Sequence, residues 1–199
     1  MDAVSEDDQP KTLTGVFIDH NVWDILLALR IDLDVEFPRD LFGIGITREA
    51  EFEIAATAAA NPALKAYIDE IIERRGITVD SYFGFFDPTL PLDEQRVGGF
   101  DVGRWASAPE LQFIASQRQR PQTTKRKTKL HKDEADISLA ARSFAASTIV
   151  LTCDKDRGPL RDAHRQGGNV IYLNDFPTSG LALGDYVAAA IAARSSRTA

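Results

Sequence analysis

The sequence has few of the residues that form covalent cross-links and zinc sites: one cysteine and three histidines among 199 residues. Cys153, the single cysteine, cannot form an internal disulfide, and no group of Cys and His has the spacing of a zinc site. We therefore expect neither a disulfide framework nor a structural zinc ion.

Long apolar runs are also missing. No run approaches the roughly 18 residues that a membrane helix needs, and residues 1–10 lack the basic start and apolar stretch of a signal peptide. Internal repeats, heptads and Gly-rich phosphate loops are absent as well. These absences lead us to expect a cytoplasmic protein that has no membrane partner.

Positive charge is scarce overall but concentrated in one place. The formal net charge of −7 argues against the whole surface being an electrostatic match for nucleic acid. Between Gln117 and Lys132, however, no acidic residue interrupts a basic strip. Its members are Arg118, Arg120, Lys125, Arg126, Lys127, Lys129 and Lys132. Such a strip can bind phosphates or form a solvated loop, and the sequence leaves both uses open.

Apolar runs that alternate with helical patterns predict one α/β domain over residues 13–199, after a flexible tail at 1–12. We expect strands at 13–18, 41–46, 77–79, 148–153 and 169–173. We expect helices at 21–30, 47–61, 62–75, 109–117, 133–146, 161–166 and 181–194. Residues 31–40 are compatible with either a connection or an edge strand. The alternation favours a three-layer α/β/α sandwich with a mainly parallel central sheet, interrupted by an insertion at about 80–130 that lacks a regular period.

Acidic side chains recur where strands end or helices begin. The positions are Asp19, one of Glu49, Glu51 and Glu53, then Asp136 and Asp154. In parallel sheets the carboxyl ends of the strands share one edge, where ligands bind. Converging carboxylates repel each other unless cations neutralise them, and oxygen ligands favour Mg²⁺ or Mn²⁺, which activate water for displacement at phosphorus. Each acid taken alone is also compatible with an ordinary helix cap or dipole partner.

The order of these acids and their local motifs resembles the PIN-domain nucleases, including the VapC-like toxin ribonucleases. Phe17-Ile18-Asp19-His20-Asn21 is similar to the opening motif of that family. Val150-Leu151-Thr152-Cys153-Asp154-Lys155-Asp156 resembles its strand ending in Thr-x-Asp-x-Asp, and Asp136-Ile137-Ser138-Leu139-Ala140-Ala141 resembles its third motif. Glu53, six residues after Thr47, matches the second acid, with Glu49 as a substitute on the same helical face. The resemblance covers residues 13 to about 76 and 130 to about 176.

The resemblance implies a PIN-like fold and a Mg²⁺- or Mn²⁺-dependent endoribonuclease that hydrolyses RNA phosphodiesters. It assigns Asp19, Glu53, Asp136 and Asp154 as catalytic metal ligands, with Asp156 as an auxiliary ligand. Thr152 and Asn21 then serve as supporting polar groups. The resemblance further implies a toxin of a toxin–antitoxin pair, with an antitoxin protein as partner and a homodimer as the assembly.

Two other functions remain open from the sequence. One is a catalytically inactive PIN-like module that binds RNA or protein. The other is a receiver or phosphatase-like domain, although a phosphatase favours Asp-x-Asp where this chain has Asp19-His20-Asn21. His20 is expected to point away from Asp19, and Cys153 is expected to be a small core residue.

The insertion has three open uses: an RNA-binding flap, an antitoxin-binding surface or a disordered excursion. Its aromatic residues favour a hydrophobic cluster beneath the loop over stacking on unpaired bases. The residues in question are Tyr82, Phe83, Phe85 and Phe86.

Overall fold

The computed structural model describes residues 13–118, 130–131, 133–154 and 157–198. Its centre is a five-stranded sheet in which every pairing is parallel, with the strand order β3-β2-β1-β4-β5. The strands are β1 (Thr14–Ile18), β2 (Phe42–Thr47), β3 (Thr78–Asp80), β4 (Thr148–Thr152) and β5 (Val170–Tyr172). This sheet confirms the predicted α/β class.

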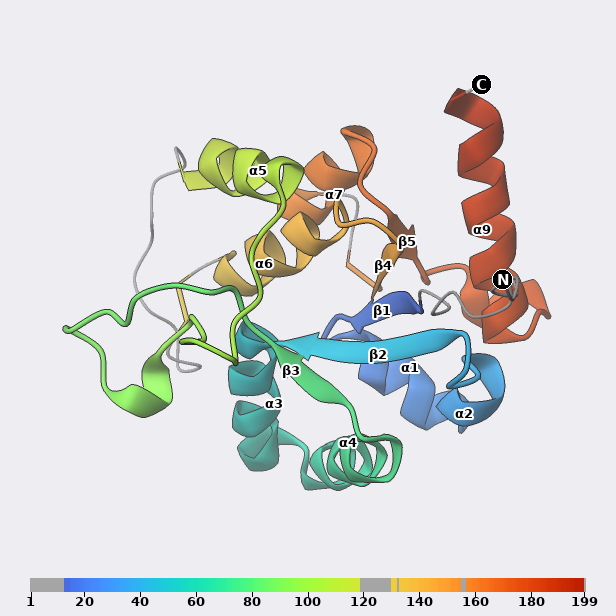
Figure 1. Ribbon diagram of the computed structural model, residues 1–199. Helices are drawn as coiled ribbons and strands as arrows, with labels where there is room; N and C mark the ends of the chain where they lie inside the picture. Colours follow the sequence, from blue (N-terminus) through green and yellow to red (C-terminus); the bar gives the residue numbers. More distant parts are fainter. Residues whose placement is uncertain (1–12, 119–129, 132, 155–156, 199) are drawn as a thin grey trace, which may run out of the picture.

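Helices connect the strands and cover both faces of the sheet (Figure 1). They are α1 (Val22–Leu29), α2 (Leu33–Glu36), α3 (Arg48–Ala60), α4 (Pro62–Arg75), the short 3-10 helix η2 (Leu92–Glu94), α5 (Ala108–Arg118), α6 (Glu134–Arg142), α7 (Gly158–Arg165), α8 (Phe176–Ser179) and α9 (Leu183–Thr198). None of the helices within the described ranges combines the length and apolar character that a membrane span requires.

The sheet separates two hydrophobic cores, and β4 contributes to both. Ile149 and Leu151 point into a core formed with α1, α3, α4, α8 and α9, whereas Val150 points into a core formed with α5, α6 and α7. This alternation is the period of two of a strand that is buried on both faces. Figure 1 shows α5, α6 and α7 on one side of the sheet and α1, α3 and α4 on the other, which confirms the three-layer sandwich.

Local signals in the sequence set several helix boundaries. Thr47 caps α3, because its Oγ1 accepts a hydrogen bond from the Ala50 N–H at 3.0 Å. The Asn61 side chain caps α4 in the same way through the Leu64 N–H at 3.1 Å. Gly76, with φ of 66°, ends α4 in the left-handed conformation that glycine adopts without strain. The predicted limits of these two helices are therefore confirmed.

Other boundaries differ from the prediction. Residues 31–40 hold neither a plain connection nor an edge strand, because Asp32 caps the helical turn α2 by accepting from the Asp34 N–H. The helix expected to reach residue 146 ends at Arg142, and the chain turns into β4 through Ser147 at φ of 53°. Helix α7 begins at Gly158 rather than at residue 161, since Pro159 is well suited to a first helical turn.

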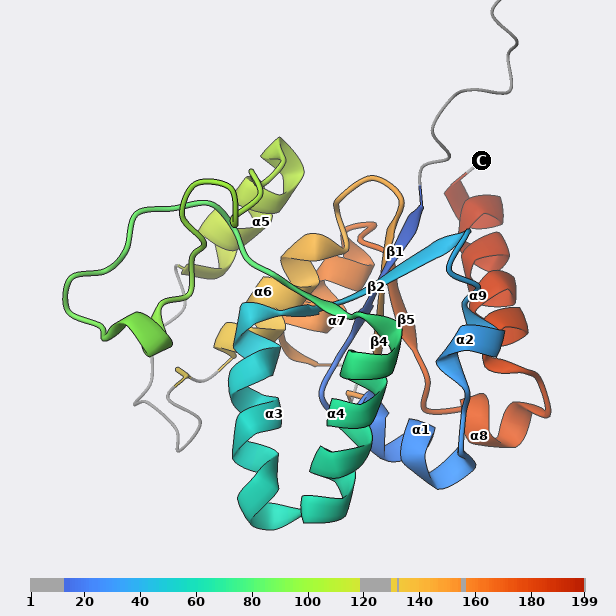
Figure 2. The ribbon, with the colours of Figure 1, turned by 60° about the horizontal axis from the view of Figure 1, so that its bottom comes forward.

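The insertion expected at about 80–130 begins where β3 ends, and its described part includes η2 and α5. In Figures 1 and 2 its green segment extends beside the first turns of α3 and α6. The basic strip expected after Gln117 falls outside the described residues, except for the backbone of Arg118 in α5. The tail at 1–12 also falls outside them.

Candidate functional site

The strand order brings the first and last acidic motifs together. β1 lies between β2 and β4, so the chain leaves β1 toward one side of the sheet and later returns to the other side. In open α/β sheets such a switch point, at the carboxyl ends of the strands, is where ligands bind. Ile18 pairs with Leu151, which places the next residues, Asp19 and Thr152, next to each other.

Asp19 is held in a defined orientation at this point. It is 7% exposed, and its Oδ2 accepts a hydrogen bond from the Thr152 hydroxyl at 2.6 Å. Thr152 Oγ1 in turn accepts from the Asp154 N–H at 2.9 Å. The Asn21 side chain accepts from the Cys153 N–H at 2.8 Å. Hydrogen bonds therefore join the ends of β1 and β4, with Thr152 and Asn21 in supporting positions.

The surroundings of Asp19, beside Asp154, are unfavourable for an ionised carboxylate without a bound cation. Burial raises the pKa of Asp19 to about 6, the hydrogen bond from Thr152 opposes this shift, and the charge of Asp154 raises the pKa further. The last effect shows that the two carboxylates are close enough to repel each other. A cation bound between them would relieve both the burial and the repulsion.

The acids of α3 occupy two different settings. Glu49 is 7% exposed, and its Oε2 accepts from the Ser138 hydroxyl of α6 at 2.6 Å. Burial raises the pKa of Glu49, while the Arg142 guanidinium and the Ser138 hydrogen bond act in the opposite direction. Glu49 thus joins α3 to α6. Glu53 lies one turn further along the same face and is half-buried.

Contacts on either side of Glu53 show where its helical face points. One turn before it, Glu49 contacts α6, and one turn after it the Thr57 hydroxyl lies 3.2 Å from His20 Nε2. The face that carries Glu53 is therefore turned toward the carboxyl ends of the strands. His20 faces α3 through this contact, and burial lowers its pKa.

Asp136 stands in the first turn of α6 and is half-buried. Because α6 leads directly into β4, which runs in the opposite direction, the first turn of α6 lies at the carboxyl edge of the sheet. Asp136 is therefore at the same edge as Asp19 and Asp154. Asp156 falls outside the described residues.

The carboxylates share an edge without forming a tight cluster. Among the residues that the structure describes, no three His, Cys, Asp or Glu side chains lie close enough together to hold a metal ion. The contacts bring Asp19 and Asp154 together and direct Glu49 to Ser138. Glu53 and Asp136 approach the edge from α3 and α6.

Cys153 follows Thr152 and packs partly against the first core. Burial raises the pKa of its thiol to about 12, and the negative charges of Asp19 and Asp24 add to the shift. A thiol held in its neutral form is a poor nucleophile, which agrees with the predicted role as a packing residue.

A buried ionic network behind Glu49 was not predicted from the sequence. Arg142 is fully buried, and it donates from Nε to Asp80 Oδ2 at 2.5 Å and from Nη1 to the Ser138 hydroxyl at 2.7 Å. Asp80 also accepts from Arg104 Nε of the insertion at 3.0 Å. The only signal available in the sequence was an arginine inside an otherwise small and apolar helical face.

The insertion is joined to the same edge by a second set of contacts. Arg48, at the start of α3, donates to the Gln95 carbonyl at 3.0 Å and lies 4.6 Å from the centre of the Phe52 ring. Arg96 lies 4.8 Å from the same ring and donates to Glu134 of α6 at 2.8 Å. The described part of the insertion therefore packs beside the first turns of α3 and α6.

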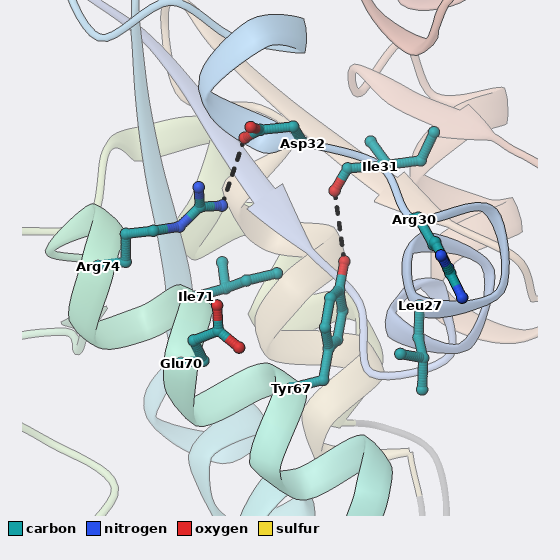
Figure 3. Close-up of a pocket in the computed structure, with 8 residues that line it drawn as sticks. All are labelled: Leu27, Arg30, Ile31, Asp32, Tyr67, Glu70, Ile71 and Arg74. Atoms are coloured by element: carbon teal, nitrogen blue, oxygen red, sulfur yellow. Dashed lines mark hydrogen bonds and ion pairs between the residues drawn. The ribbon is translucent and has the colours of Figure 1, made fainter.

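A surface hollow elsewhere contains none of these residues. It lies between α4 and the carboxyl end of α1, the end opposite Asp19 (Figure 3). Its polar groups bond to each other: Tyr67 donates to the Ile31 carbonyl at 3.4 Å, and Arg74 donates to Asp32 at 3.3 Å. These contacts attach α4 to the segment that follows α1.

Comparisons of the chain with protein-family models, with curated proteins and with solved structures find no match. The functional assignment therefore depends on the residues and on the geometry described above.

Proposed function

We propose that this protein is a metal-dependent endoribonuclease, and that Asp19 and Asp154 are the centre of its active site. The observation that carries the proposal is the meeting of Asp19 and Asp154 at the switch point of the sheet. The buried Asp19 carboxylate accepts from the Thr152 hydroxyl, and the backbone N–H of Asp154 donates to the same hydroxyl. A buried carboxylate beside a second carboxylate is costly unless a cation neutralises the pair.

The donor set fits a hard divalent cation such as Mg²⁺ or Mn²⁺. Asp19 and Asp154 offer carboxylate oxygens, which these ions prefer over nitrogen or sulfur. Glu53 and Asp136, which approach the same edge from α3 and α6, are the proposed further ligands, and Asp156 is an auxiliary one. When bound, the cation would supply the positive charge that hydrolysis of a phosphodiester requires.

The protein's own residues would orient this charge. Thr152 holds Asp19 through Oδ2, and Asn21 fixes the backbone at Cys153 directly before Asp154. Glu49 is a supporting residue and not a proposed ligand, because its carboxylate accepts a hydrogen bond from Ser138 and lies near Arg142. We therefore propose Glu53, rather than Glu49, as the second acid.

The resemblance to toxin ribonucleases extends the proposal. It adds RNA as the substrate, an antitoxin as the protein that restrains the activity and a homodimer as the assembly. These features depend on the resemblance alone.

Cleavage of single-stranded RNA in Mn²⁺ tests the proposal. Asp19→Asn and Asp154→Asn should each lower the cleavage rate by at least about 100-fold, because each removes a carboxylate of the proposed centre. Asp175→Asn, an exposed acid at the start of α8, is the matched control and should retain full activity. Cleavage by both site variants at the native rate would disprove the assignment.

The two glutamates of α3 give a second comparison. Glu53→Gln should abolish cleavage with little change in the free energy of unfolding. Glu49→Ala should mainly reduce stability, because it removes the acceptor of a buried hydrogen bond from the Ser138 hydroxyl. The reverse pattern would exchange the two roles.

A second candidate function is an inactive PIN-like module that binds RNA or protein. It is favoured by the absence, among the described residues, of three potential ligands close enough to share an ion. This candidate requires that calorimetry find no saturable Mn²⁺ binding and that the native protein cleave no RNA. Saturable binding that Asp19→Asn abolishes would exclude it.

A further inference from the structure

His20 connects the two elements that carry the proposed ligands Asp19 and Glu53. It follows Asp19 in the turn between β1 and α1, and its Nε2 atom lies 3.2 Å from the Thr57 hydroxyl oxygen of α3. Figure 2 shows this turn beside α3. Thr57 is 7% exposed and His20 is half-buried, so the contact is largely shielded from water. The hydrogen bond therefore joins the end of β1 to α3.

The contacts of Thr57 fix the direction of this hydrogen bond. The Thr57 hydroxyl donates to the Glu53 carbonyl at 3.0 Å. Because a hydroxyl has a single proton, Thr57 Oγ1 accepts from His20, and Nε2 of the neutral ring carries the proton. The other ring nitrogen, Nδ1, has no hydrogen-bond partner among the described residues. Only the Nε2 side of the His20 ring therefore takes part in the contact.

His20 is attached to both proposed ligands. Its side chain donates to Thr57, whose hydroxyl holds the backbone of Glu53 one turn earlier. Its backbone acts at the other end: burial raises the pKa of Asp19 to about 6, and a backbone hydrogen bond from His20 to this carboxylate opposes the shift. A chain of hydrogen bonds thus runs from the Asp19 carboxylate through His20 and Thr57 to Glu53.

Helix α3 is anchored on both sides of Glu53. It packs on α4, α6, β2 and β3, and Glu49 fixes its first turn to α6 by accepting from Ser138 at 2.6 Å. The contact between His20 and Thr57 fixes a later turn to the end of β1. Contacts behind the ligands are important in divalent metal sites, because they set the distances at which the ligand oxygens meet the ion.

We propose that His20 and Thr57 are positioning residues, which hold Glu53 at the distance from Asp19 at which both carboxylates bind one divalent cation. This role rests on the proposed function, because both residues act on the same metal site. Neither residue is itself a ligand, since Nε2 of His20 bonds to Thr57 and the Thr57 hydroxyl bonds to the Glu53 carbonyl. Loss of the contact should therefore weaken metal binding although every proposed ligand is still present.

Calorimetric titration of Mn²⁺ into the full-length chain at pH 7 tests this role. Thr57→Val keeps the branched shape of the side chain but removes the hydroxyl, and it should weaken Mn²⁺ binding about tenfold. Thr57→Ser keeps the hydroxyl, so it should bind Mn²⁺ within about twofold of the native chain. Urea unfolding of the same variants in the presence of a chelator measures their stability without the ion.

Two substitutions of His20 form a matched pair. Glutamine places its amide nitrogen near the position of Nε2 in histidine, whereas asparagine reaches only as far as Nδ1. His20→Gln should therefore retain nearly native Mn²⁺ binding. His20→Asn should weaken Mn²⁺ binding as much as Thr57→Val does.

Thr178→Val is the matched control for the loss of a threonine hydroxyl. Thr178 is exposed in α8, and its hydroxyl donates to the Asp175 carbonyl three residues earlier at 3.1 Å. This variant should bind Mn²⁺ like the native chain. In RNA cleavage, a saturating concentration of Mn²⁺ should bring Thr57→Val near the native rate and leave Asp19→Asn at its reduced rate, since only Thr57→Val keeps all the proposed ligands.

Several results would overturn the positioning role. Native Mn²⁺ affinity in Thr57→Val, together with a lower free energy of unfolding, would make the contact a purely structural one. Equal losses of affinity in Thr57→Ser and Thr57→Val would show that shape, rather than the hydroxyl, matters. Saturable binding that Asp19→Asn abolishes and Thr57→Val leaves unchanged would refute the positioning role alone. Absence of Mn²⁺ binding by the native chain would refute it together with the proposed nuclease.

Discussion

At the scale of single residues, the position of Asp19 is unfavourable for its negative charge. It is buried, it accepts a hydrogen bond from Thr152, and it lies close to Asp154. Burial and the neighbouring charge both favour the protonated form. A residue that reduces stability in this way is typical of a functional position.

The first prediction concerns the pH dependence that Asp19 produces. Its pKa of about 6 in the folded chain exceeds the ordinary value of 3.8, so the folded state binds the proton more tightly than the unfolded state does. Stability should therefore fall as the pH rises from about 4 to about 6. Asp19→Asn should remove this loss and raise the free energy of unfolding at pH 7 by about 2–3 kcal/mol. Urea unfolding in the presence of a chelator, at pH 3.5 and pH 7, measures the difference.

The control for this prediction is Asp175→Asn, whose unfolding curves should follow those of the native chain at both pH values. Parallel pH profiles for Asp19→Asn and the native chain would contradict the reasoning. Added Mn²⁺ should raise the free energy of unfolding of the native chain at pH 7 and leave that of Asp19→Asn unchanged. The reason is that the ion binds the ionised Asp19 carboxylate, which the variant lacks.

At the scale of elements, the junction between the insertion and the sheet depends on Glu110 in α5. Its carboxylate accepts from Arg104, Ser107 and Tyr82. Burial alone would raise the pKa of Glu110, but the hydrogen bonds from Arg104 and Ser107 outweigh it and lower the pKa to about 2. The Glu110 carboxylate therefore holds the insertion most strongly when it is ionised.

The second prediction follows from this attachment. The folded pKa lies below the ordinary value of 4.5, so the stabilisation is present above pH 4.5 and is lost as the pH falls toward 2. Glu110→Gln should lower the free energy of unfolding by about 2–3 kcal/mol at pH 7 and have a much smaller effect near pH 2.5. Thermal unfolding followed by circular dichroism at the two pH values measures this effect.

Glu73→Gln, at an exposed position in α4, serves as the charge-matched control and should change stability little at either pH. A loss for Glu110→Gln that is equally large at both pH values would show that shape, rather than charge, holds the insertion.

At the scale of the whole molecule, the sheet divides the interior into two cores. Ile149 and Val150 are neighbours in the sequence, yet their side chains lie in different cores. Leu151 shares the first core with Ile149. The energetic coupling between substitutions should follow the layers of the fold and not the order of the chain.

The third prediction states this coupling. Ile149→Val should cost about 1 kcal/mol and Val150→Ala about 2 kcal/mol, and the double variant should show their sum within about 0.5 kcal/mol. Ile149→Val combined with Leu151→Ala should deviate from additivity, because the two side chains point into one core. Urea unfolding of the single and double variants provides the free energies. Strong coupling between Ile149 and Val150 would contradict the separation into layers.

Much of the architecture was predictable because it depends on neighbours along the chain. Buried strands of apolar residues and the limits of the helices expected at 47–61 and 62–75 depend on local features, and the structure confirms them. The helical turn α2 and the end of α6 at Arg142 were missed. Their lengths depend on what they pack against, for example on Arg75, which donates to the Leu33 carbonyl of α2 at 2.7 Å.

The sequence by itself determined that acids would lie at one edge of a parallel sheet, because local apolar and polar patterns determine where strands end and helices begin. Only the tertiary structure decided that Glu49 bonds to Ser138, 89 residues away, that Arg142 lies buried against Asp80, and that the rings around Phe83 face the solvent. Such partners are chosen by packing between segments distant in the chain. A pattern confined to one segment carries no information about the side chain that another segment will bring to it.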